Sequence, residues 1–223
     1  RSTRSARTVL AHALEHGPDA RTLALLVRLL DRAGHGEDAA SLIAASQRFT
    51  NVRTDLGCAT AGLEALIELE RWRFASELSN GWLNRKALAP PDFFAMACQA
   101  FRKSERWAPL GAAAAEFREV ADTGRASWAD FYLGLAYVRQ SGAGRDVVDA
   151  GRLMLTSRFL TSTDAEPEPG MRALAYREAA LASRFLGEAN AERENLKGAL
   201  DLEPDADGEL WLRLAELQYQ SPN

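Results

Sequence analysis

The sequence predicts an all-α fold, a solenoid of antiparallel helical hairpins, on the basis of three observations. Runs that alternate apolar and polar residues, as half-buried strands do, are absent from the sequence. Strong helix formers instead fill blocks of about 12–16 residues, with Gly, Pro, Asp or Asn between the blocks. The pattern also returns at a fixed period, because the tripeptide Glu-Arg-Trp at 70–72 occurs again at 105–107, 35 positions later. A single hairpin cannot bury both of its apolar faces, so this period predicts stacked hairpins.

The composition narrows the class of protein further. The chain has 223 residues, of which 47% are hydrophobic, which is enough for a sizeable core. It contains no run of 18 apolar residues, so we expect no membrane insertion within this sequence. The formal net charge of -4 argues against nucleic acid as a partner. The first residues, RSTRSARTVL, hold neither a Met nor an apolar signal-peptide core, so we expect a segment of a longer protein.

The N-terminal part is expected to hold a half repeat at 1–19 and a first hairpin at about 20–54. Apolar residues from Leu23 to Leu30 recur at i, i+3, i+4 and i+7, which is one face of a helix, and Gly34 ends that helix. The half repeat ends like a later second helix that runs into a Pro-Asp link. In that comparison Leu10, Ala13, Leu14, Pro18 and Asp19 correspond to Leu196, Ala199, Leu200, Pro204 and Asp205.

Four more hairpins and a final half repeat complete the expected array. Trp72 and Trp107 occupy the same place in successive repeats, so we expect them to pack between hairpins. The acidic, Pro-rich segment at 160–172 is expected to be a loop, either a tolerated insertion or a protrusion that contacts a partner. The hairpins are expected at about 55–90, 91–125, 126–170 and 171–206, and the half repeat at 207–223.

Several of these segments resemble the tetratricopeptide repeat (TPR) family. Residues 133–137, Leu-Gly-Leu-Ala-Tyr, match the family's Leu-Gly-x-x-Tyr signature. Residues 187–205, GEANAERENLKGALDLEPD, match the second half of a repeat, although Glu192 stands where a small residue is usual. The resemblance implies a right-handed superhelix whose first helices, one from each hairpin, line a concave surface. It also implies a protein that binds other proteins.

Residue patterns that carry catalysis or bind cofactors are absent from the sequence. It has no nucleophile elbow, and the glycines at 142–145 lack the strand–loop–helix context of a phosphate site. His12 and His16 are four apart, a spacing that suits a metal, but no third ligand is near them. Cys58 and Cys98 lie in apolar helical stretches, as buried unpaired thiols do. We therefore predict no enzyme activity, no cofactor and no metal.

A largely basic face of the first helices is the candidate binding site. Arg guanidinium groups suit bidentate binding of carboxylates, and clustered cations speed the capture of acidic partners. The alternative is an ordinary solvated surface, because one face of any such helix must meet water. The candidate partner-binding residues are Arg28, Arg32, Gln99, Arg102, Lys103, Phe131, Arg139, Arg177 and Arg184.

These features predict a non-enzymatic scaffold that binds a protein or peptide, with an acidic contact surface, on its concave face. Two alternatives stay open. The chain resembles the periplasmic TPR region of outer-membrane exopolysaccharide secretion proteins, which recruits polymer-modifying enzymes. Its Arg- and Ala-rich composition is typical of GC-rich bacteria, and the resemblance favours the periplasm over the cytoplasm. The second alternative is a helical regulatory domain of a larger enzyme or regulator.

Overall fold

The structure, a computed structural model, describes residues 56–83, 90–163, 167–205 and 208–220, and scattered positions up to Gly34. The long described ranges consist of helices and turns, and none of their residues lies in a strand. The predicted all-α fold class is confirmed. The chain divides into two compact units, residues 1–109 and 110–223. The half repeat at 1–19 and the hairpin at 20–54 fall almost wholly outside the described residues.

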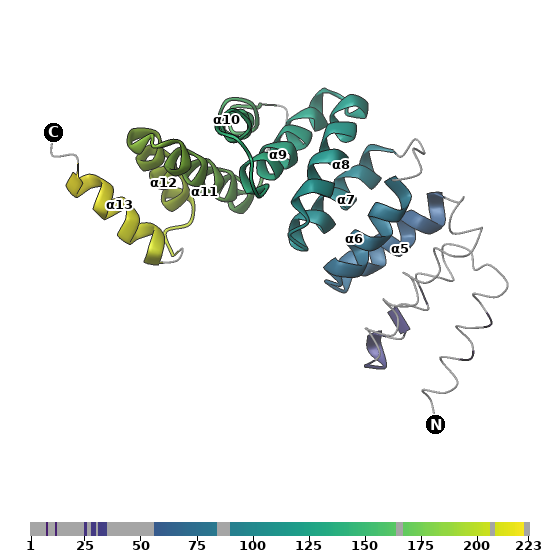
Figure 1. The fold of residues 1–223 in the computed structure, drawn as a ribbon. Helices are drawn as coiled ribbons and strands as arrows, with labels where there is room; N and C mark the ends of the chain where they lie inside the picture. The colour runs from purple at the N-terminus through teal and green to yellow at the C-terminus, as the bar shows by residue number, and fades with distance from the viewer. Residues whose placement is uncertain are drawn as a thin grey trace. The chain divides into compact units, whose positions relative to one another are not determined.

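The elements are α5 (Leu56–Glu68), α6 (Trp72–Leu83), α7 (Pro91–Lys103), α8 (Trp107–Val120), α9 (Thr123–Arg139), α10 (Arg145–Leu153), the π-helix η1 (Met154–Phe159), α11 (Pro169–Leu186), α12 (Ala189–Leu202) and α13 (Gly208–Gln220). Short turns join α5 to α6, α7 to α8 and α11 to α12, and Figure 1 shows the chain folding back at these turns. The first helices of the hairpins are thus α5, α7, α9, α11 and α13. No described helix has the length and apolar character that crossing a membrane requires.

A left-handed residue ends several first helices. Glu70 has φ 55°, Glu105 has φ 56° and Gly187 has φ 80°. At each end a backbone amide bonds a carbonyl five residues back, which satisfies groups that the helix terminus would leave open. These bonds run from Arg71 to Leu66 (2.8 Å), from Arg106 to Phe101 (2.9 Å) and from Glu188 to Ser183 (2.9 Å). The recurring Glu-Arg-Trp is therefore a turn, in which Glu takes the left-handed position and Trp begins the second helix.

The first unit buries its core where α5 and α6 meet α7. Trp82 of α6 is 6% exposed and lies with its ring centroid 5.9 Å from that of Phe93 of α7. Trp72 and Trp107, expected to be packing residues, are only partly buried. Both stand at the first position of a second helix, beside a turn, where one side of the ring meets solvent.

Aromatic rings on α9 and η1 form one part of the core of the second unit. The rings of Phe131 and Phe159 lie 4.6 Å apart, and Trp128 meets Phe159 edge-on at 5.4 Å. Gly134, from the Leu-Gly-x-x-Tyr signature, lets α9 approach α10 closely. A Cβ at Gly134 would lie 2.9 Å from the carbonyl oxygen of Gly151, so a larger residue would push the two helices apart.

The expected loop at 160–172 is shorter than the sequence predicted. The helix α11 already begins at Pro169, which occupies its first turn, where the missing amide costs no hydrogen bond. The composition of the segment suggested an interruption because Pro and Gly occur at its end. In the structure these two residues begin the helix instead. Residues 164–166 lie outside the described part of the chain.

Candidate functional site

Phe131, one of the candidate partner-binding residues, is a core residue. Its side chain is 0% exposed and contacts the rings of Trp128, Tyr132 and Phe159. The helix α9 packs against α10, η1 and α11, so little of its surface meets solvent. The prediction that Phe131 faces a partner is therefore wrong, because the helix has neighbours on the side that we expected to be open.

Two of the candidate arginines bind a carboxylate of this chain through two hydrogen bonds each. The Nε and Nη2 atoms of Arg139 donate to the two carboxylate oxygens of Glu178, both at 2.6 Å. Arg28 makes the same two-pronged contact with Glu68, both bonds at 3.0 Å. Its guanidinium lowers the pKa of Glu68 by hydrogen bonding. The two residues of each pair lie 39 and 40 positions apart in sequence, so each pair joins two different helices. The bound Glu occupies the guanidinium edge that a partner carboxylate would use.

The other candidate residues differ in their exposure to solvent and in their contacts. Arg177 of α11 contacts Glu203 at 3.0 Å. In the first unit Gln99 and Arg102 are partly buried, and the Lys103 ammonium lies 5.7 Å from the centre of the Trp72 ring. Arg32 and Arg184 are exposed. Among the described residues, Arg184 has no ion-pair partner.

The exposed face of α11 combines cations with apolar side chains. Arg177, Leu181, Arg184 and Phe185 stand at i, i+4, i+7 and i+8, which places them on one side of the helix. Leu181 is 40% exposed and Phe185 is 55% exposed. Neither residue is among the candidates predicted from the sequence, because large apolar residues four apart on a helix more often pack in a core. The signal was a pair of large apolar residues four apart among the arginines of a supposedly polar face.

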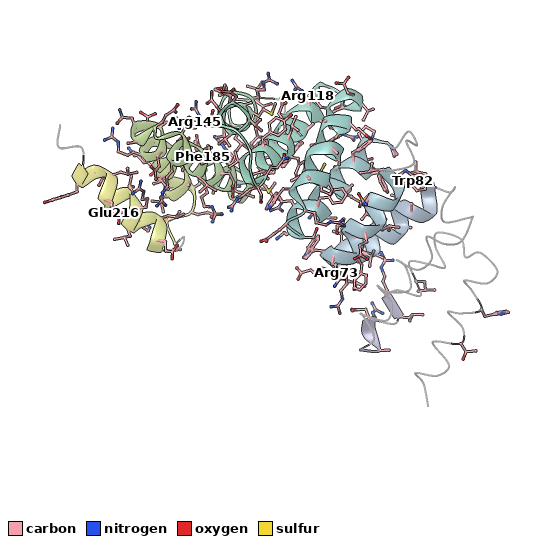
Figure 2. The ribbon with its side chains drawn as sticks, in the orientation of Figure 1. Arg73, Trp82, Arg118, Arg145, Phe185 and Glu216 are labelled. Carbon is pink, nitrogen blue, oxygen red and sulfur yellow. The ribbon has the colours of Figure 1, made fainter. Side chains whose placement is uncertain are left out.

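An apolar pocket of about 540 Å³ opens beside this face. Its walls come from the end of α9, the turn at 140–144, α10 and α11. Arg145 holds this arrangement, because its Nη2 donates to the carbonyl oxygen of Leu186 at 2.5 Å and so ties the start of α10 to the end of α11. Figure 2 marks Arg145 and Phe185 in the second unit. The residues that line the pocket include Val138, Ala143, Val148, Leu181, Phe185 and Arg184.

A smaller and more polar hollow of about 150 Å³ lies between α11, α12 and α13, and it shares Leu181 and Arg184 with the apolar pocket. It holds Glu192, the residue that departs from the family pattern. Arg213 of α13 donates to both oxygens of Glu192, at 2.7 and 3.0 Å. These bonds raise the pKa of Arg213. The large residue is therefore accommodated as half of an ion pair between neighbouring helices.

The described residues show no arrangement that suggests catalysis. Within them, no three His, Cys, Asp or Glu side chains gather as metal ligands would. Cys98 is a buried free thiol, and burial raises its pKa, so this thiol is not primed as a nucleophile. His12 is exposed, whereas His16 and the side chain of Cys58 lie outside the described part. The site thus offers binding surfaces, one apolar and one cationic.

Comparisons with solved structures show the same fold. The chain is similar to YrrB, described as a TPR protein with an unusual peptide-binding site, at 17% identity and a TM-score of 0.57, over 93% of this chain and 97% of that one. It is also similar to the C-terminal part of a TPR repeat-containing protein from Cytophaga hutchinsonii, at 11% identity and a TM-score of 0.51, over 90% and 75% of the two chains. No protein-family model and no curated protein matches the sequence. The fold is that of tetratricopeptide-repeat proteins.

Proposed function

We propose that this protein is a non-enzymatic interaction scaffold that holds a peptide segment of a partner protein on its first-helix face. One observation carries the proposal. On α11, the exposed side chains of Leu181 and Phe185 border an apolar pocket and stand beside Arg184. Apolar side chains left in solvent beside an open pocket are typical of binding surfaces.

The fold supports the same function. Stacked hairpins present long rows of first-helix side chains, which suit an extended ligand. The similar protein YrrB is described as having a peptide-binding site. We also propose that the contact surface of the partner is acidic, although fewer of the candidate cations are available to bind it than the sequence predicted. Arg28, Arg139 and Arg177 are paired within the chain, so Arg184 is the candidate cation of the second unit that has no ion pair among the described residues.

Selection of peptides from a random display library on the whole chain tests the function. We expect selected peptides to lose affinity at least about tenfold for Leu181→Asp, because a buried apolar contact becomes a desolvated charge. The matched control is Leu153→Asp on α10, since Leu153 is 45% exposed and Leu181 is 40% exposed. Equal losses for both variants, or a library that gives no binding peptide, would count against a first-helix binding face.

A further inference from the structure

We propose that the apolar pocket and Arg184 form one composite site for a partner segment that carries an apolar side chain, aromatic or Leu, close to a carboxylate. This inference rests on the proposed scaffold function and names the ligand class of the α11 face. The segment would place its apolar side chain in the pocket and its carboxylate over Arg184, and it would then cross α11 toward α13.

The pocket has the size and walls of an apolar subsite. Its volume of about 540 Å³ lies within the roughly 300–1,000 Å³ of ligand sites, and it is larger than one side chain needs. Val148 in its lining is 4% exposed and packs with Ala182 and Leu186, so the floor is firm and apolar. The space beside Gly142 in the turn is open, because a Cβ there would meet no atom within 4 Å. The volume and the apolar walls therefore suit an aromatic or Leu side chain.

The positive charge of Arg184 at the rim of the pocket favours a carboxylate as the second group of the ligand. Among the residues that line this pocket, Arg184 is the one charged side chain, and it has no ion pair within the described part of the chain. Arg145 nearby is held by the Leu186 carbonyl. A carboxylate placed at the rim would therefore meet an uncompensated guanidinium whose planar edge can donate two hydrogen bonds.

The second hollow gives the direction of the ligand. Leu181 and Arg184 line both hollows, so the apolar pocket and the polar hollow adjoin each other along α11. Arg213 in the second hollow is already bound to Glu192 and Glu216, so it offers less to a ligand carboxylate than Arg184 does. A peptide backbone can hydrogen-bond the polar second hollow, whereas the tail of a fatty acid would leave it unfilled. The two hollows together thus favour a peptide.

A charge-exchange experiment on the whole chain tests this proposal. The probes are fluorescein-labelled nine-residue Gly/Ser peptides with one Trp and one Glu, separated by one to four positions. Matched peptides carry Lys in place of Glu, or Ser in place of Trp. In fluorescence polarisation, we expect the best Trp–Glu peptide to bind at least about tenfold more tightly than either matched peptide. With Arg184→Glu, the preference should reverse toward the Trp–Lys peptide. This reversal measures directly the interaction between residue 184 and the charged residue of the peptide.

Two controls keep the result specific. Lys197→Glu on α12 makes the same charge change at another exposed cation, and it should leave the preference for Glu unchanged. Phe185→Asp should lower affinity for both Trp peptides, since Phe185 is 55% exposed and lines the pocket. Thermal melting by circular dichroism must show that each variant keeps its fold. Arg184, Lys197 and Phe185 are all exposed, so we expect folding to be retained in the three variants.

Three outcomes would overturn the composite site. The first is a preference for Glu that persists in Arg184→Glu. The second is a Trp–Glu set that shows no binding up to about 1 mM. The third is decanoate that binds more tightly than the peptides and displaces them, which would make the pocket a lipid site. Library peptides whose affinity does not change with Arg184→Glu would refute the composite site but not the scaffold function. The absence of any binding peptide would refute both.

Discussion

Arg139 of α9 and Glu178 of α11 join the first helices of two neighbouring hairpins through two hydrogen bonds of 2.6 Å. The Glu178 side chain is 7% exposed and the Arg139 side chain is 44% exposed. The carboxylate is therefore the member that depends on its partner, because the guanidinium keeps access to water. Arg28 and Glu68 repeat the relationship with both side chains about half exposed, so that pair contributes less to stability.

Arg139→Ala should destabilise the protein more than Glu178→Gln does. The first change leaves a buried carboxylate without its donor, at a cost of about 1–3 kcal/mol. The second keeps the side-chain volume and one acceptor oxygen, and should cost below about 1 kcal/mol. Urea unfolding of both variants checks this order. If Arg139→Ala proved the milder change, Glu178 would have access to other donors or to water.

Arg139→Glu is for the same reason a poor probe of partner binding. It would place two carboxylates together in a nearly buried position, so lost binding would reflect lost stability. Arg184 is the better probe, because within the described residues it has no ion pair to lose.

The fold class is predictable from the sequence because the relevant signals are local. Glu105 and Gly187 end helices through their own backbone conformation, and Gly134 permits a close helix approach at a fixed place in the repeat. These signals recur with the hairpin period, so they can be read without knowledge of the neighbours. The same reasoning failed where the answer depends on what surrounds a helix. Phe131 looked exposed because the neighbours of α9 were not considered.

The site was only partly predictable for a related reason. The sequence predicted that Arg139, Arg177 and Arg184 lie on one basic face of the first helices, but that prediction considered the cations without their acidic partners. Glu178 lies 39 positions after Arg139, about one repeat period, so this ion pair could have been predicted from the spacing. The apolar pair Leu181 and Phe185 is also visible in the sequence, but apolar residues at i and i+4 more often belong to the core. Their exposure depends on the absence of a helix over that part of α11 within the described part of the chain.

Glu105→Gly should stabilise the protein by about 0.5–1 kcal/mol. Glu105 has φ 56°, a left-handed conformation that an L side chain adopts at a cost and that Gly adopts freely. The gain is reduced by the greater flexibility of Gly in the unfolded chain. Chemical denaturation should show a higher midpoint. Glu105→Ala is the control, and it should show no gain because Ala retains the Cβ that causes the strain.

Phe131→Ala should cost about 3–5 kcal/mol, the range for removing a fully buried aromatic side chain. Trp107→Ala should cost clearly less, because Trp107 is only partly buried and a smaller cavity would form. Calorimetric melting of the two variants gives the comparison. Equal destabilisation would mean that the Trp107 ring makes contacts as extensive as those of the core ring.

Glu68 should titrate below the ordinary range of a glutamate, since hydrogen bonding to Arg28 lowers its pKa. A depressed folded pKa contributes stability that is present above the unfolded value and is lost as the pH falls through the folded one. Carboxyl NMR shifts over the range of about pH 2–6 should show this depression. Arg28→Gln should return the pKa of Glu68 toward its usual value. A titration unchanged by that substitution would show that the ion pair is not populated in solution.

Salt should weaken the binding of a Trp–Glu peptide, and Arg184 should account for most of that weakening. A contact between an exposed guanidinium and a carboxylate is screened as ionic strength rises, because the Debye length shortens from about 8 Å at 0.15 M toward about 3 Å at 1 M. The insertion of an apolar side chain into the pocket is not screened in this way. We therefore expect affinity to fall several-fold between about 0.05 and 0.5 M NaCl for the wild-type chain and to change little for Arg184→Gln. Lys197→Gln should keep the salt dependence of the wild type. A fall of equal size in all three proteins would assign the screened attraction to the charge of the whole surface rather than to Arg184.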